Sequence, residues 1–249
     1  MVQAVLGLLF PARYRDVEWI AATWWGNDWV TLGLAVPLLG FGATRAARGS
    51  IRGLLLSIGI LAYGLYNYAY YLFGAALNVF FVLYLCGVLL SAVALILLLS
   101  HIDASAISAH FRASARVRIA GGYFVFVGVA LATVWLTMWA AHVFAGHPTP
   151  IEPEAFKLVA ALDTVLMVPA LTVGGAMLLR RQPWGYVLAC AAGVQASLYL
   201  TVLSVNSVVL VARRLVAAPG ESPFWGTVAA TTVGMTLLLF TNITETGEE

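Results

Sequence analysis

Residues 157–179 read KLVAALDTVLMVPALTVGGAMLL, and this stretch decides the class of the protein. After Lys157 it stays apolar for long enough to cross the hydrocarbon core of a bilayer, which takes about 20 residues. Its one further charge is Asp163. An ionised aspartate at the centre of a membrane helix costs about 2.5–3.5 kcal/mol, so such a residue is a functional-site hypothesis by default. The stretch therefore predicts a membrane span that carries a candidate functional carboxylate.

The composition of the whole chain agrees with a lipid environment. Of the 249 residues, 62% are hydrophobic and 10% are charged, whereas a soluble domain carries about 25% charged residues. Such a chain cannot cover itself with polar surface in water, so the lipid bilayer is its expected partner. The net charge of +2 is small and scattered, which argues against a nucleic-acid partner.

Six further apolar runs, separated by loops rich in arginine, proline or polar residues, complete about seven spans. We predict an all-α integral membrane protein, a bundle in a single polytopic domain over residues 1–249. Residues 1–26 are predicted to be an interfacial N-terminal segment with a short helix on the membrane surface, or else part of a larger N-terminal fold. The predicted spans are 28–45, 52–75, 77–100, 118–143, 156–179, 184–211 and 223–243.

The sequence shows no strong internal repeat. The number of spans alone allows spans one to three and five to seven to form two three-helix halves around span four.

The distribution of basic residues predicts the orientation, because cytoplasmic loops carry an excess of Lys and Arg. One set of loops carries eight basic residues: Arg45, Arg48, Arg52, Arg112, Arg116, Arg118, Arg180 and Arg181. The opposite side carries five: Arg13, Arg15, Lys157, Arg213 and Arg214. We therefore predict a multi-pass protein of the cell membrane with its N-terminus outside and its acidic tail (Glu245, Glu248, Glu249) in the cytoplasm.

The second span is unusually polar and reads LAYGLYNYAYYLFGAALN over residues 61–78. Its members Tyr63, Tyr66, Asn67 and Tyr70 follow the i, i+3, i+4, i+7 spacing of one helix face, and Tyr71 borders that face. Buried tyrosine hydroxyls and amides require hydrogen-bond partners, so this face is not expected to meet lipid. The interpretations are a hydrogen-bonded seam between helices, a wall that lines a ligand or ion site and, for the outer tyrosines, a belt at the membrane interface.

In the deduced orientation, polar residues of several spans fall in the outer half of the membrane. We predict that they form one ligand-binding pocket, with Asp163 as its charged or protonatable member. No basic residue lies within a span, so a buried Asp163 is expected to hold a proton at pH 7. The alternative is a structural hydrogen bond to a neighbouring helix. The predicted site residues are Asp163, Asn67, Tyr66, Tyr70, Tyr71, Asn78, Gln195, Tyr199 and Asn206.

Other chemistries lack their residues in the sequence. The four histidines lie in loops or at span ends, and His101, Asp103 and His110 match no metal-ligand spacing. HExxH, paired deep aspartates and glycine-rich nucleotide motifs are absent. The last span contains no lysine for a retinal Schiff base. We therefore predict no metal, no cofactor and no catalytic residues.

The leading hypothesis is a membrane protein that binds or transports a small molecule or ion. The first alternative is a structural or accessory subunit whose polar stripes hold helices together. The second is an intramembrane enzyme that modifies a lipid, with Asp163 as acid or base. The abundance of glycine and alanine is compatible with a homo-oligomer or with a partner membrane subunit.

Overall fold

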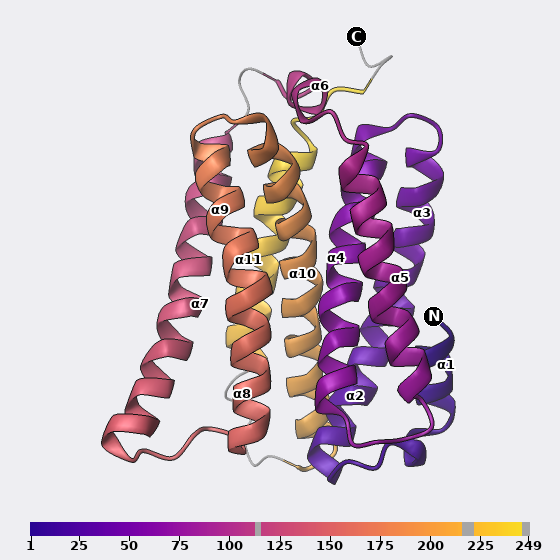
Figure 1. Ribbon diagram of the computed structural model, residues 1–249, viewed down its shortest axis with the longest axis vertical. Helices are drawn as coiled ribbons and strands as arrows, with labels where there is room; N and C mark the ends of the chain where they lie inside the picture. The colour runs from indigo at the N-terminus through magenta and orange to yellow at the C-terminus, as the bar shows by residue number, and fades with distance from the viewer. Residues whose placement is uncertain (113–115, 216–221, 246–249) are drawn as a thin grey trace.

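The computed structural model describes residues 1–112, 116–215 and 222–245. It is a bundle of long helices, with α6 and the C-terminal segment at one end and α1 near the other (Figure 1). These are called the α6 end and the α1 end below. Glu248, Glu249 and most of the predicted sixth loop lie outside the described residues.

Apart from one isolated bridge between Phe111 and Ile243, the regular structure of the described residues is helical. The first half of the chain forms α1 (Val2–Leu9), η1 (Pro11–Arg13), α2 (Glu18–Val30), η2 (Thr31–Ala35), α3 (Val36–Ala46), α4 (Ile51–Gly74), α5 (Phe81–Ser100) and α6 (Ala104–Ala109). The second half forms α7 (Val117–Ala145), α8 (Pro153–Leu162), η3 (Asp163–Met167), α9 (Val168–Leu179), α10 (Pro183–Ala212) and α11 (Ser222–Phe240).

Within the described part of the chain, six continuous helices are long and apolar enough to span a membrane, which fits a multi-pass membrane protein. They are Glu18–Ala46, Phe81–Ser100, Val117–Ala145, Pro153–Leu179, Pro183–Ala212 and Ser222–Phe240. Several of them turn large apolar side chains outward: α5, for example, exposes Leu89, Leu90 and Ile96. Such a surface suits lipid rather than water.

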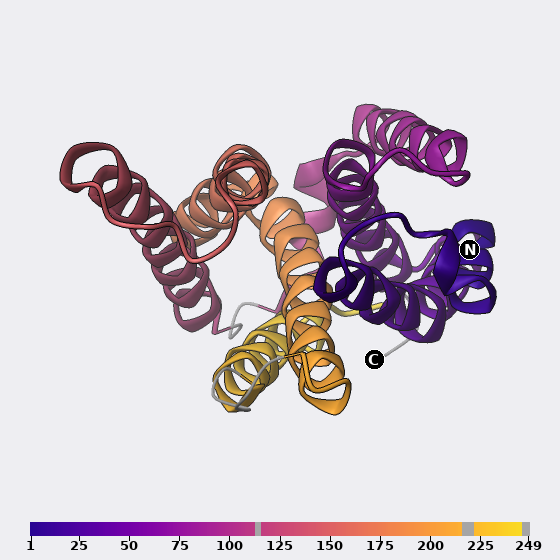
Figure 2. The same cartoon turned by 90° about the horizontal axis from the view of Figure 1, so that it is seen from below.

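The helix α4 has 24 residues but is not among these six, because its tyrosines and Asn67 make it less hydrophobic. It is instead one of the two helices at the centre of the bundle. It packs against α3, α5 and α10, while α10 packs against α2, α9 and α11 (Figure 2). The polar face that the sequence predicted on this segment is therefore covered by protein.

The first long helix begins at Glu18, whereas the sequence analysis placed the start of the first span near residue 28. The first ten residues of the helix include polar ones, so the apolar run begins later than the helix does. The difference matters, since Asp28 lies well inside a helix and is fully buried. The preceding helix α1 runs roughly along the bundle axis beside α2 (Figure 1); its interfacial position remains a prediction.

At the α6 end, the segment after α11 crosses to the start of α4. The Glu245 carboxylate accepts hydrogen bonds from the Ser50 hydroxyl (2.8 Å) and from the backbone N–H groups of Arg52 (3.0 Å) and Ile51 (3.3 Å). The Arg52 guanidinium donates to the carbonyl of Ile243. Glu245 thus satisfies N–H groups that a helix start leaves without intrahelical partners.

Candidate functional site

Asp163 is the first residue of η3 and is only 1% exposed. Its carboxylate accepts a hydrogen bond of 2.6 Å from the Tyr66 hydroxyl on α4 and one of 2.9 Å from the Trp135 indole N–H on α7. Tyr199 on α10 lies beside this pair, and its ring packs edge-on against that of Tyr66 with 4.9 Å between centroids. The carboxylate therefore has two donors, one from α4 and one from α7, with a side chain of α10 next to them.

The local helix geometry at Asp163 is unusual. Residues Asp163–Met167 form a π-helical turn, which ends just before Pro169. Proline has no N–H and crowds the carbonyl four residues earlier, so a wider turn relieves the clash. Such π-turns occur often at functional sites. A second one, Thr31–Ala35, ends just before Pro37.

A chain of side-chain amides connects three helices beside this site. Asn206 of α10 donates to Asn27 of α2 (2.9 Å), and Asn27 donates to Asn67 of α4 (3.4 Å). Asn67 then lies 3.5 Å from the Thr31 hydroxyl, which also shares a 3.1 Å hydrogen bond with Tyr63. The structure thus brings together two predicted site residues, Asn67 and Asn206, through Asn27.

Asp28 forms a second buried carboxylate cluster nearer the α1 end. It accepts hydrogen bonds from Tyr71 of α4 (2.9 Å), from Gln3 of α1 (3.0 Å) and from the Tyr14 hydroxyl. Burial, followed by the negative charge of Asp28, raises the pKa of Tyr14, which keeps its hydroxyl protonated as a donor. The cluster anchors α1 and the turn after it to the bundle.

The remaining predicted site residues occupy other places. Tyr70 packs its ring against Trp24, with 4.8 Å between centroids. Asn78 accepts from the N–H of Phe80 (2.8 Å) and lies 3.3 Å from the Tyr84 hydroxyl, so it shapes the turn before α5. Gln195 is buried on α10. The predicted residues are therefore spread over several hydrogen-bonded groups rather than around one open pocket.

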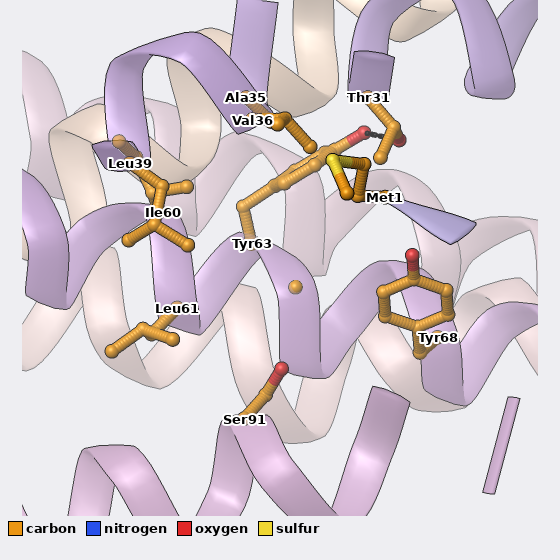
Figure 3. Close-up of a pocket in the computed structure, with 11 residues that line it drawn as sticks. Met1, Thr31, Ala35, Val36, Leu39, Ile60, Leu61, Tyr63, Tyr68 and Ser91 are labelled. Carbon is orange, nitrogen blue, oxygen red and sulfur yellow. Dashed lines mark hydrogen bonds between the residues drawn. The ribbon is translucent and has the colours of Figure 1, made fainter. Parts of the chain in front are cut away.

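A small cavity adjoins the amide chain on the side of α5. It has a volume of about 100 Å³. Its lining includes the side chains of Tyr63, Tyr68, Ser91 and Thr31 (Figure 3). A water molecule occupies about 30 Å³ in the liquid, so the cavity suits a few waters or a ligand of similar size. Asp163 does not line this cavity.

Sequence reasoning missed several residues of these clusters. Trp135 stands in an apolar run that reads as lipid-facing, and nothing in the run marks its N–H as a donor. Gln3 and Tyr14 lie in the segment predicted to be interfacial. Asn27 and Asp28 lie at the start of the first predicted span and were not among the predicted site residues.

The chain was compared with protein-family models, with curated proteins and with solved structures, and no match was found in any of the three comparisons. The function must therefore be inferred from the site itself.

Proposed function

We propose that the protein binds a proton or a small cation at Asp163 and carries it, alone or with a small solute, across the membrane. In this proposal α4 is a seventh span. The N-terminus and the α1 end face the outside of the cell membrane, and the α6 end faces the cytoplasm, as the arginine distribution predicts.

The observation that carries the proposal is the enclosed carboxylate of Asp163. Tyr66 and Trp135 are both donors to it, and an amide or hydroxyl oxygen could accept the same two bonds at a lower cost of desolvation. A structural role therefore does not require a carboxylate. A bound proton does require an ionisable group, and a carboxylate also gives a bound cation the compensating negative charge within the membrane.

The position of the site supports movement of that ligand. The two donors belong to α4 and α7, whereas Asp163 belongs to η3, so a shift of η3 relative to these helices changes the number of donors around the carboxylate. Fewer donors favour the protonated or cation-bound form, and more donors favour the free anion. The π-turn next to Pro169 is a place where the helix can adjust.

A scaffold is the competing function, and one observation favours it. Asp163 is 1% exposed and already surrounded by hydrogen-bond donors, as expected for a group that only ties helices together. The two functions differ in what a neutral residue of the same shape does at this position.

The test is proton flux in proteoliposomes loaded with a pH-sensitive dye, driven by a potassium diffusion potential. We expect the wild type to exceed protein-free vesicles and Asp163→Asn to fall to their rate while remaining folded. The control is Asp103→Asn, the same chemical change at an exposed helix N-cap, where asparagine caps as well. Wild-type flux in Asp163→Asn, or a wild type with no flux together with an unstable Asp163→Asn, would favour the scaffold.

Native mass spectrometry of the same variants, released from nanodiscs, identifies a solute that accompanies the proton or cation. A small ligand present on the wild type and absent from Asp163→Asn would name it. A stoichiometric protein partner on both would speak for an accessory subunit.

A further inference from the structure

Two segments of the chain carry the same sequence pattern. Residues 34–42 read LAVPLLGFG and residues 166–174 read LMVPALTVG, which share the pattern L-x-V-P-x-L-x-x-G. Further identical residues follow after this pattern at the same spacing, with no insertion or deletion between the two segments. All pairs are 132 positions apart: Leu34 and Leu166, Val36 and Val168, Pro37 and Pro169, Leu39 and Leu171, Gly42 and Gly174, Arg48 and Arg180, Gly53 and Gly185, and Leu56 and Leu188.

The backbone follows the same spacing. The π-turns begin at Thr31 and at Asp163, and the next helices begin at Val36 and at Val168. The backbone φ is positive at Gly49 (+85°) and at Arg181 (+54°), two residues before the starts of α4 and α10. A positive φ is rare for a residue other than glycine, so Arg181 holds a conformation that the turn demands.

Close contacts inside each segment also correspond. A methyl group added at Gly42 would meet Leu56 and Ser57, and one added at Gly174 would meet the equivalent Leu188 and Ala189. An added methyl at Gly53 would meet Arg45 and Ala46, and one at Gly185 would meet the equivalent Met177 and Leu178. The hairpins α3–α4 and α9–α10 are therefore packed in the same way.

Contacts between the two segments show how they are related. Asn206 of α10 lies against Gly26 of α2, and Leu158 of α8 lies against Gly74 of α4. At the spacing of 132 positions, Gly26 is equivalent to Leu158 and Gly74 is equivalent to Asn206. The second contact is therefore the first contact with the two segments exchanged. A methyl group added at Gly59 of α4 would meet Val194 and the carbonyl of Ala191 on α10, and Ala191 is the equivalent of Gly59 itself.

Such an exchange requires a two-fold relation about an axis between α4 and α10. In the view along the bundle, α5 (magenta) and α11 (yellow) lie on opposite sides of this pair, as do α2 and α8 (Figure 2). Two unrelated helical hairpins can share a proline and a glycine by chance. Exchanged contacts and a contact of a residue with its own equivalent are not expected of unrelated hairpins.

The relation makes Thr31 the equivalent of Asp163, and Asn67 the equivalent of Tyr199. The contacts agree in part, since Asn67 donates to Thr31 (3.5 Å) and Tyr199 packs against Tyr66, the donor to Asp163. The sequence analysis, which saw no strong repeat, had thus selected residues from both copies of one structural position.

We infer that spans one to three and five to seven are two copies of one three-helix unit, and that the ligand of Asp163 binds where the two units meet. Only one copy carries a carboxylate at this position, so the site takes one positive charge, a proton or a monovalent cation. Transporters built from repeats commonly place their binding site at the interface between the repeats. The ligand part of this inference rests on the function proposed above.

Transposition of the charge tests the inference. The variants are Asp163→Thr alone, and Asp163→Thr combined with Thr31→Asp. In the second, the new carboxylate would lie beside the Tyr63 hydroxyl and the Asn67 amide, which already contact Thr31. The matched control combines Asp163→Thr with Thr232→Asp, because Thr232 is also a buried threonine but lies on α11.

Proton flux and the flux of a radiolabelled monovalent cation are measured for each variant. We expect Asp163→Thr to lose the flux, the transposed variant to recover it, and the Thr232 control not to recover it. A transporting wild type whose transposed variant recovers no flux would overturn the equivalence and leave the proposed function standing. Recovery in the Thr232 control as well would also overturn it.

If the wild type moves neither protons nor monovalent cations, the proposed function and the single-charge ligand are both refuted. Cysteine cross-linking then judges the two-fold relation alone.

If the transposed variant does not fold, cysteine cross-linking decides the two-fold relation after the native Cys86 and Cys190 are replaced. The pairs are Gly26→Cys with Asn206→Cys, and Leu158→Cys with Gly74→Cys. A short thiol-reactive cross-linker should join both pairs in membranes, and failure of either pair would overturn the inferred arrangement.

Discussion

The Tyr66 hydroxyl on α4 donates a 2.6 Å hydrogen bond to the Asp163 carboxylate on the π-turn of a helix that begins 87 positions further along the chain, at Pro153. This bond joins the tyrosine-rich helix α4 to the one charged residue in the apolar stretch of residues 158–179. It belongs to both units of the inferred duplication, since α4 lies in one and η3 in the other.

Removal of this hydroxyl should destabilise the protein. We expect Tyr66→Phe to lower the free energy of unfolding by about 1–2 kcal/mol, because a hydrogen bond to a charged group is stronger than average while bonds within membranes contribute less than in water. Unfolding of the protein in nanodiscs measures the effect. Tyr70→Phe is the matched control: its ring packs on Trp24, and loss of its hydroxyl should change stability by far less.

The Thr31 hydroxyl should contribute in a similar but weaker way. Thr31→Val keeps the shape of the side chain and removes the oxygen that Tyr63 and Asn67 contact. We expect a loss of about 0.5–1.5 kcal/mol, the usual range for a neutral hydrogen bond. Thr44→Val provides the comparison, because Thr44 is exposed and bonds only to carbonyls of its own helix. Equal losses in the two variants would contradict a role for the buried amide chain.

Close approach of α1 to Asp28 depends on a glycine. A methyl group added at Gly7 would lie 2.1 Å from an Asp28 oxygen and 2.4 Å from the Tyr14 hydroxyl. We therefore expect Gly7→Ala to push α1 away and to destabilise the protein by about 1–3 kcal/mol, the usual cost of overpacking. Accessibility of a cysteine label on α1 and unfolding in nanodiscs should both report it.

The control for this substitution is Gly33→Ala. Gly33 has no heavy atom within 4 Å of an added methyl group, so the same chemical change should be neutral or slightly stabilising. If Gly7→Ala behaved like Gly33→Ala, the packing of α1 on Asp28 would be disproved.

Most of the helices could be predicted from the sequence. The apolar runs fix α4, α5 and α7 to α11 to within a few residues, because lipid selects long uninterrupted apolar segments. The start of α2 could not be found in this way. Its residues Asn27 and Asp28 are compensated by side chains of α1, α4 and α10, and such tertiary partners leave no mark in the local pattern.

The candidate site was predictable only in part. The spacing on α4 correctly marked Tyr66 and Asn67 as buried polar residues, since one face of a helix is shared by such positions. Which of them would meet Asp163 and which would meet Asn27 depends on how the helices are rotated and packed. The sequence analysis missed the inferred duplication, although the pattern L-x-V-P-x-L-x-x-G stands twice in the sequence.

The last prediction concerns pH and the segment after α11. Burial acts to raise the pKa of Glu245, but hydrogen bonds from the Arg52 and Ile51 N–H groups and the Ser50 hydroxyl, with the Arg52 charge, lower it overall below the ordinary value of 4.5. A carboxyl with a lowered pKa stabilises the folded state above its ordinary pKa, and loses this effect as the pH falls through the lowered one. The contact should therefore hold at neutral pH and open below about pH 4.5.

Hydrogen exchange of the Ile51 and Arg52 amides measures this contact directly, because both amides donate to Glu245. We expect Glu245→Gln to exchange faster than the wild type at neutral pH, with the difference shrinking as the pH falls below the ordinary carboxyl pKa. Glu154→Gln serves as the control, since Glu154 pairs with Lys157 on the exposed surface of α8 and does not touch α4's first turn. A difference between Glu245→Gln and the wild type that persisted unchanged into acid would show that the negative charge of Glu245 does not hold the segment in place.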